Sequence, residues 1–275
     1  MTTVDLTKEL GDALNRESER RVIAQFTGAD PALVAGELRV IIEAAITNDP
    51  RSLQTRVGPS GLGVTCERCL AHMIAETPQR PEAAWLPACG RAIHEWLEKI
   101  MLNHEYVRHS LGMDGRYLPE NKINVGTVGG VQISGSTDVL DVASGTVVDW
   151  KYVGVTTLRT VKGSGASAQY RHQGNIYGKG WEDAGYTVKS ILIYFLPRNG
   201  LTLADAVPFQ FDYDRADAEN TLARANVFAN DIATHGLAAL LATLPPHDGS
   251  GFSCKRFADW TSPSINPDDP FGSTK

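Results

Sequence analysis

Residues 131–153 read VQISGSTDVLDVASGTVVDWKYV, and this stretch decides the fold. Its two halves are rich in β-branched residues and are separated by Ser144-Gly145, a two-residue hairpin signal. In such a hairpin we expect Asp138 to lie opposite Lys151. Asp149 shares their face, because it lies two residues from Lys151. The sequence therefore predicts two carboxylates and one lysine on one face of one hairpin.

Neighbouring carboxylates repel each other unless a cation or a proton lies between them. Oxygen ligands of this kind suit Mg²⁺ or Mn²⁺, and either ion can polarise a phosphoryl oxygen and supply a nucleophilic hydroxide. Lys151 would then orient the attacking water or stabilise negative charge in the transition state. An ordinary surface salt bridge on a hairpin is the alternative interpretation.

The spacing of apolar residues changes along the chain and predicts an α/β fold with a mixed central sheet flanked by helices. Helical spacing covers residues 34–45, 64–75, 90–110, 169–184 and 214–244, whereas Gly154–Ala168 has the composition of a loop. Short β-branched runs predict strands at residues 125–127, 131–141, 146–153, 188–196 and 207–213. In the helix from Gly90 we expect a buried apolar stripe of Ile93, Trp96, Leu97, Ile100, Met101 and Val107. We expect a helical accessory segment over residues 1–63, a core over 64–244 and a tail over 245–275.

The composition is that of a soluble globular protein, with 275 residues, 42% hydrophobic and 21% charged. The longest apolar run, Ile191–Leu196, is too short to cross a membrane, and the N-terminus has no secretory signal, so we expect a cytoplasmic location. A formal charge of −6 argues against coating nucleic acid over the whole surface. It allows a local basic groove, because residues 151–181 contain Lys151, Arg159, Lys162, Arg171 and Lys179 but no Asp or Glu.

Four short motifs together carry a resemblance to a known family. They are His94 in Gly90-Arg91-Ala92-Ile93-His94-Glu95, then Asp138, then Asp149-Trp150-Lys151, and finally Gln173-Gly174-Asn175-Ile176-Tyr177. In this order they resemble the PD-(D/E)XK nuclease superfamily and its RecB-like branch, which includes CRISPR-adaptation nucleases, AddB-type nucleases and phage-encoded relatives. The match spans about His94 to Leu196.

The resemblance implies a metal-dependent DNA exonuclease with a restriction-endonuclease-like core, acting in recombination, replication or repair. It implies that His94, Asp138, Asp149 and the Trp150 carbonyl bind Mg²⁺ or Mn²⁺, that Lys151 is catalytic, and that Gln173 and Tyr177 complete the site. Residues expected to contact DNA are Arg159, Lys162, Tyr170, Arg171, His172 and Lys179. His94 and the Gln173–Tyr177 pair also have purely structural interpretations. An endonuclease of the same superfamily and a non-catalytic module that binds DNA ends or serves adaptation remain the alternatives.

The implied substrate is single-stranded DNA or duplex ends. The sequence lacks a phosphate-binding helicase motif, so unwinding would come from a helicase or recombination partner. The resemblance also allows a homo-oligomer, because relatives in this branch form rings. If the chain is encoded by a phage, the expected location is the host cytoplasm.

The four cysteines, Cys66, Cys69, Cys89 and Cys254, raise the question of a second metal. Related nucleases hold a [4Fe-4S] cluster with one cysteine before the histidine motif and three near the C-terminus. This chain has three upstream and only Cys254 downstream. A [4Fe-4S] cluster on the four thiolates, a zinc ion on the same four sulfurs, and unliganded thiols all stay open.

Overall fold

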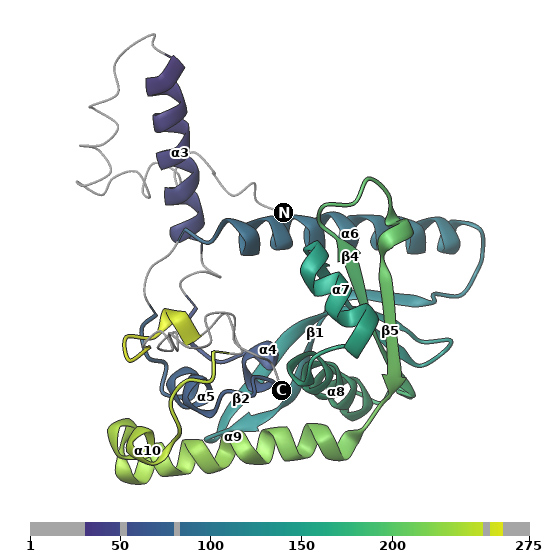
Figure 1. Ribbon diagram of the computed structural model, residues 1–275. Coiled ribbons are helices and arrows are strands. Elements are labelled where there is room, and N and C mark those ends of the chain that lie inside the picture. The colour runs from purple at the N-terminus through teal and green to yellow at the C-terminus, as the bar shows by residue number, and fades with distance from the viewer. Residues whose placement is uncertain (1–30, 50–53, 80–82, 250–253, 261–275) are drawn as a thin grey trace, which may run out of the picture. The chain divides into compact units, whose positions relative to one another are not determined.

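The computed structural model describes residues 31–49, 54–79, 83–249 and 254–260 (Figure 1). The chain divides into two compact units, residues 1–54 with 81–89, and residues 55–80 with 90–275. In the first unit α3 spans Pro31–Thr47, which confirms the helix expected over residues 34–45. Residues 1–30 of the expected accessory segment and 261–275 of the expected tail lie outside the described residues. The three-part division at residues 64 and 245 stays a prediction.

The second unit is built on one mixed sheet of five strands in the order β1-β2-β3-β4-β5. The strands are β1 (Tyr117–Val128), β2 (Val131–Asp141), β3 (Thr146–Val153), β4 (Ser190–Pro197) and β5 (Val207–Asp212). All neighbours pair antiparallel except β3 and β4, which are parallel. The α/β fold with a mixed central sheet flanked by helices is therefore confirmed.

Two helices, α7 (Val155–Ser164) and α8 (Ala168–Asp183), connect the parallel strands β3 and β4. The loop predicted over Gly154–Ala168 was wrong, because most of that segment forms α7. Its buried Leu158 and Val161 are three residues apart, which is helical spacing, although the surrounding Gly and Ser residues indicated a loop. The helix predicted over residues 169–184 is confirmed as α8.

The hydrophobic core lies where α8 packs on the sheet. On β4, Ile191, Ile193 and Phe195 are fully buried, as is Ile176 of α8. Glycine lets the helix approach this closely: a Cβ on Gly174 would lie only 2.5 Å from Cγ2 of Ile191. The distance between α8 and β4 is thus fixed by the absence of a side chain.

The hairpin between β2 and β3 forms with a register that differs from the prediction. Asp141, rather than Ala143, pairs with Thr146. The carboxylate of Asp141 accepts hydrogen bonds from the Ala143 N–H and the Ser144 hydroxyl, so the turn is longer than Ser144-Gly145. The expected pairing of Asp138 with Lys151 was therefore wrong by two residues. A shift of two preserves the face of every side chain, so Asp138, Asp149 and Lys151 still share one side.

The remaining elements are α4 (Pro59–Leu62), α5 (Glu67–Ile74), α6 (Trp85–Ser110), η1 (Leu203–Asp205), α9 (Arg215–His235), α10 (Leu237–Thr243) and η2 (Cys254–Arg256). The single helix expected over residues 214–244 is two, because Gly236 adopts φ 82° between α9 and α10. The buried stripe expected on α6 was also wrong: none of its residues is buried, and Trp96 is 58% exposed. Within the described ranges, no helix is long and apolar enough to span a membrane.

Adding one methyl group to α8 tests its close approach to β4. We expect Gly174→Ala to lower the free energy of unfolding by about 1–3 kcal/mol, because the new Cβ would overpack Ile191. Gly163→Ala on α7 is the control, since its Cβ would meet nothing within 4 Å and should leave stability unchanged or slightly higher. Urea denaturation followed by circular dichroism measures both, and equal stabilities would contradict the packing argument.

Candidate active site

Asp138 of β2 forms the first part of the candidate site. Its Oδ1 lies 2.9 Å from Nδ1 of His94 on α6, and its Oδ2 accepts a 2.6 Å hydrogen bond from the Trp150 backbone N–H on β3. The hydrogen bond to Asp138 raises the pKa of His94, and the charge of Asp138 adds to this effect, while burial opposes it. The imidazole and the carboxylate therefore form a charge-assisted pair that a metal ion would replace by displacing the proton.

Asp149 and Lys151 of β3 form a buried ion pair beside it. Lys151 Nζ lies 2.6 Å from Asp149 Oδ2, and the two side chains are only 16% and 6% exposed. Burial alone would lower the pKa of Lys151, but the charge of Asp149 and its hydrogen bond outweigh burial and raise that pKa. Burial raises the pKa of Asp149, against the charge of Lys151. Lys151 is therefore held as an ammonium at neutral pH.

Gln173 of α8 connects to both members of this ion pair. Its Oε1 accepts a 3.2 Å hydrogen bond from Lys151 Nζ, and its Nε2 donates a 3.3 Å hydrogen bond to Asp149 Oδ1. On the same helix, the Tyr170 ring lies 5.2 Å from Lys151 Nζ and meets the ring of Phe195 edge-on. The Lys151 ammonium is thus oriented by a carboxylate, an amide and an aromatic face.

Glu120 of β1 is absent from the set predicted from the sequence, but the structure places it at the site. The neighbouring pairs Pro119↔Val139 and Asn121↔Thr137 put Glu120 at the position facing Asp138. A bulge between Asn124 and Gly126 shifts the register by one residue, which selects the face on which Glu120 lies. Glu120 also has φ 48°, a left-handed backbone conformation that is uncommon outside glycine. An uninterrupted strand would have placed Asn121 opposite Asp138 instead.

One group of side chains in this region fits a divalent metal ion. His94, Glu120 and Asp138 offer one ligand atom each, and these atoms lie within 4.8 Å of one another. Two carboxylate oxygens and one imidazole nitrogen suit Mn²⁺, and the oxygens suit Mg²⁺. The expected ligand Asp149 instead points its carboxylate at Lys151 and Gln173. The remaining expected ligand, the backbone carbonyl of Trp150, stays a prediction. The N–H of Trp150 donates to Asp138, and its ring lies near that of Tyr194.

The other predicted residues are Tyr177, the expected DNA contacts and the cysteines, and each has its own surroundings in the structure. Tyr177 is buried one turn after Gln173, where a Cβ on Gly135 would lie 3.3 Å from its ring. Of the expected DNA contacts, Arg159 and Lys162 are exposed on α7. His172 pairs with Asp217 of α9, Lys179 pairs with Asp183, and the guanidinium of Arg171 lies over the ring of Phe209. Three of the cysteines, Cys66, Cys69 and Cys254, gather elsewhere in the same unit, whereas Cys89 belongs to the first unit.

Comparison with known proteins gives a distant likeness in fold. The chain matches no protein-family model and no curated protein sequence. Among solved structures, an alkaline exonuclease (LHK-Exo) from Laribacter hongkongensis is 13% identical, with a TM-score of 0.44 over 70% of this chain and 94% of that one. SSO0001 is also 13% identical, with a TM-score of 0.44 over 75% and 88%. LHK-Exo in complex with dAMP is 14% identical, with a TM-score of 0.43 over 68% and 92%.

Removing one member of the buried ion pair tests its geometry. Lys151→Met leaves Asp149 buried without its counter-charge, so we expect a loss of about 3–5 kcal/mol in the free energy of unfolding. The double variant Lys151→Met/Asp149→Asn removes both charges and should recover at least half of that loss. Urea denaturation in EDTA measures each variant without a bound metal. A double variant no more stable than Lys151→Met alone would show that the two side chains are not coupled.

Proposed function

We propose that this chain is a metal-dependent nuclease that hydrolyses DNA phosphodiester bonds. The observation that carries the proposal is the group of His94, Glu120 and Asp138 beside a buried, oriented Lys151. The charges of Lys151 and Asp149 act on His94, so the candidate metal group and the ammonium belong to one electrostatic environment. A cation site next to a fixed ammonium suits a reaction in which negative charge develops on a phosphate.

In this proposal His94, Glu120 and Asp138 hold one Mg²⁺ or Mn²⁺ ion. When bound, the ion supplies charge neutralisation on the scissile phosphate and lowers the pKa of a water molecule. Lys151 holds the attacking water and stabilises negative charge on the phosphate oxygens. Gln173 is a positioning residue, because it fixes both Lys151 and Asp149 through its amide. Asp149 keeps Lys151 charged within a largely buried site.

The substrate class is supported by the distribution of exposed basic groups. Arg159 and Lys162 of α7 line a hollow that also includes Asn199, Gly200 and one acidic residue, Asp205, of the segment after β4. Both side chains are exposed, so phosphates of a strand can reach them and be positioned without sequence readout. Tyr170 already has Lys151 on its ring face, which makes it a support for the lysine as well as a candidate contact for a base.

We propose exonuclease action, on single strands or duplex ends, in DNA recombination, replication or repair. The choice of exonuclease over endonuclease action rests on the Gln173–Tyr177 motif and its resemblance to the RecB-like branch. The chain would then depend on a helicase or recombination partner wherever its substrate is an unopened duplex.

Two aspartates of one strand provide a matched test of the site. Asp138→Asn should lower metal-dependent cleavage of DNA by at least about 10²-fold, because it weakens a ligand of the proposed ion. Asp141→Asn should keep cleavage within about threefold, because Asp141 lies on the opposite face and pairs with Arg116. Release of nucleotides from labelled DNA with Mn²⁺, with Mg²⁺ and with EDTA measures both. Equal losses in the two variants would argue against the proposed site.

A substrate without ends separates exonuclease from endonuclease action. We expect the unmutated chain to degrade end-labelled linear single-stranded DNA and to leave a closed circle of the same sequence intact. The label that is released first gives the polarity. Cleavage of the circle at a comparable rate would establish an endonuclease, and binding without cleavage of either substrate would indicate a non-catalytic DNA-binding module.

A further inference from the structure

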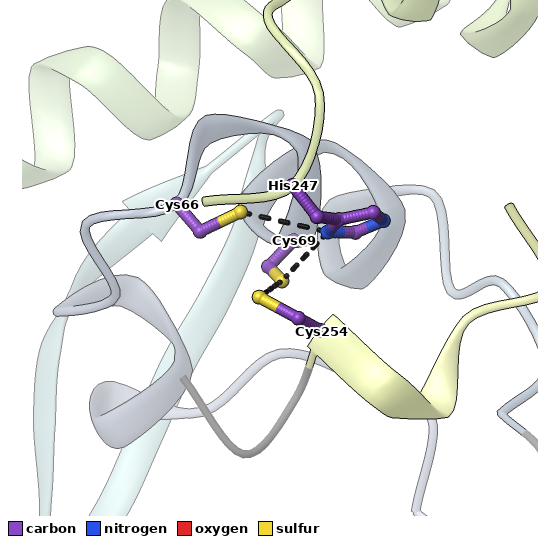
Figure 2. A group of neighbouring side chains, drawn as sticks. All are labelled: Cys66, Cys69, His247 and Cys254. Atoms are coloured by element: carbon purple, nitrogen blue, oxygen red, sulfur yellow. Dashed lines mark hydrogen bonds between the residues drawn. The ribbon is translucent and has the colours of Figure 1, made fainter. Parts of the chain in front are cut away.

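Three cysteines and one histidine from two distant parts of the sequence meet at one point, apart from the candidate active site (Figure 2). Cys66 and Cys69 lie at the start of α5, and His247 and Cys254 follow α10. Cys69 Sγ lies 3.3 Å from Cys254 Sγ and 3.3 Å from His247 Nδ1, and Cys66 Sγ lies 3.5 Å from the same nitrogen. All four ligand atoms lie within 4.8 Å of one another. The group has the size of the ligand set around a single ion.

This group is closed off from solvent. Cys254 is 0% exposed, Cys69 is 1% exposed and Cys66 is 5% exposed. The side chain of His247 is 3% exposed. Three thiols are weak hydrogen-bond donors and poor partners for one another, so hydrogen bonds alone explain little of their convergence. A disulfide between Cys69 and Cys254 would leave the positions of Cys66 and His247 unexplained.

The His247 ring nitrogen that faces away from the sulfurs, Nε2, is hydrogen-bonded to a carboxylate, as is usual in metal-bound histidines. His247 Nε2 lies 3.0 Å from Oδ1 of Asp259, so this nitrogen donates its proton to the carboxylate. Asp259 is held in turn by Arg68, at 2.9 Å, and by His72, at 3.0 Å. The tautomer with a proton on Nε2 leaves the Nδ1 lone pair directed at the sulfurs.

We propose that Cys66, Cys69, His247 and Cys254 bind one Zn²⁺ ion as a structural site. Three sulfurs and one nitrogen form a closed tetrahedral set, and Cys-x-x-Cys is a common spacing for two of its ligands. Sulfurs about 2.3 Å from a zinc ion lie about 3.8 Å apart, which compares with 3.3 Å between Cys69 Sγ and Cys254 Sγ and with the 4.8 Å limit on all four ligand atoms. A [4Fe-4S] cluster has four irons between its thiolates, so its ligands lie much farther apart. His247 is therefore the fourth ligand of this set, in place of Cys89, which the four-cysteine prediction had included.

The zinc ion would fasten the segment after α10 to α5. Phe257 is fully buried and stacks on His72 of α5, with ring centroids 4.5 Å apart. Arg68 of α5 donates to the Leu241 and Leu244 carbonyls at the end of α10. Cys69 and Cys254 are separated by 185 positions, so one ion would close a loop that includes the whole sheet. A ligand that binds only the folded chain stabilises it.

The metal content of the purified full-length chain tests this proposal. We expect one zinc per chain by inductively coupled plasma mass spectrometry after dialysis. Cys254→Ser and His247→Ala should each reduce bound zinc at least about tenfold, because each leaves an incomplete ligand set. Cys89→Ser is the matched control and should keep one zinc, because Cys89 is outside the group. His94→Ala should also keep it, which separates this ion from any ion in the candidate active site.

A second measurement uses the unmutated chain, so it does not depend on the folding of the variants. Modification of the thiols with a mercurial reagent should release one zinc, detected with a chromophoric indicator. The same chain loaded with Co²⁺ should show the visible ligand-field bands of a tetrahedral thiolate site. The proposal is wrong if the chain contains no metal, if it contains iron and acid-labile sulfide, if zinc is retained after thiol modification, or if mass spectrometry finds a Cys69–Cys254 disulfide.

Discussion

The buried ion pair between Asp149 and Lys151 is the interaction on which the rest of the site depends. Two charges can be buried on a sheet only if they are paired and their remaining hydrogen-bonding capacity is satisfied. Gln173 of α8 gives each charge one hydrogen-bond partner, and it reaches both because Gly174 lets the helix lie against β4. The packing of one helix and the chemistry of the site are therefore set by the same contact. A bulkier residue at Gly174 would move the amide away from both partners.

The candidate site shows which parts of an arrangement short motifs can predict. Asp138, Asp149 and Lys151 were predicted from the hairpin pattern, and Gln173 from the resemblance to a nuclease family. The structure brings the four together, although their roles stay proposals. Glu120 was missed because its position depends on a one-residue bulge, and no periodicity reveals a bulge before the partner strand is known. His247 was missed for a related reason. It lies far from Cys66 and Cys69 in the sequence, and only the packing of the C-terminal segment on α5 brings it near them.

The fold was predicted well where local composition and tertiary packing agree. Strands β2 to β5 and the mixed sheet follow from β-branched runs separated by glycine and serine, whereas β1 begins at Tyr117, eight residues before the strand predicted at 125–127. The hairpin register failed because the Asp141 side chain caps a longer turn than Ser144-Gly145 indicated. The predicted burial of the apolar stripe of α6 was wrong for a different reason. Helical spacing identifies an amphipathic helix, but it does not show whether another element covers its apolar face. Gly236 divided a helix that the apolar spacing alone treats as continuous.

The position of the Cys66–Cys69–His247–Cys254 group in the sequence also constrains when it can form. A ribosome releases the N-terminal half of a chain first, so Cys66 and Cys69 emerge long before Cys254 does. During synthesis the two early thiols lack their later partners, because all five strands of the sheet lie between Cys69 and Cys254 in the sequence. The group can therefore form only after Cys254 has been synthesised, and a product truncated before Cys254 would keep the early thiols exposed to oxidation.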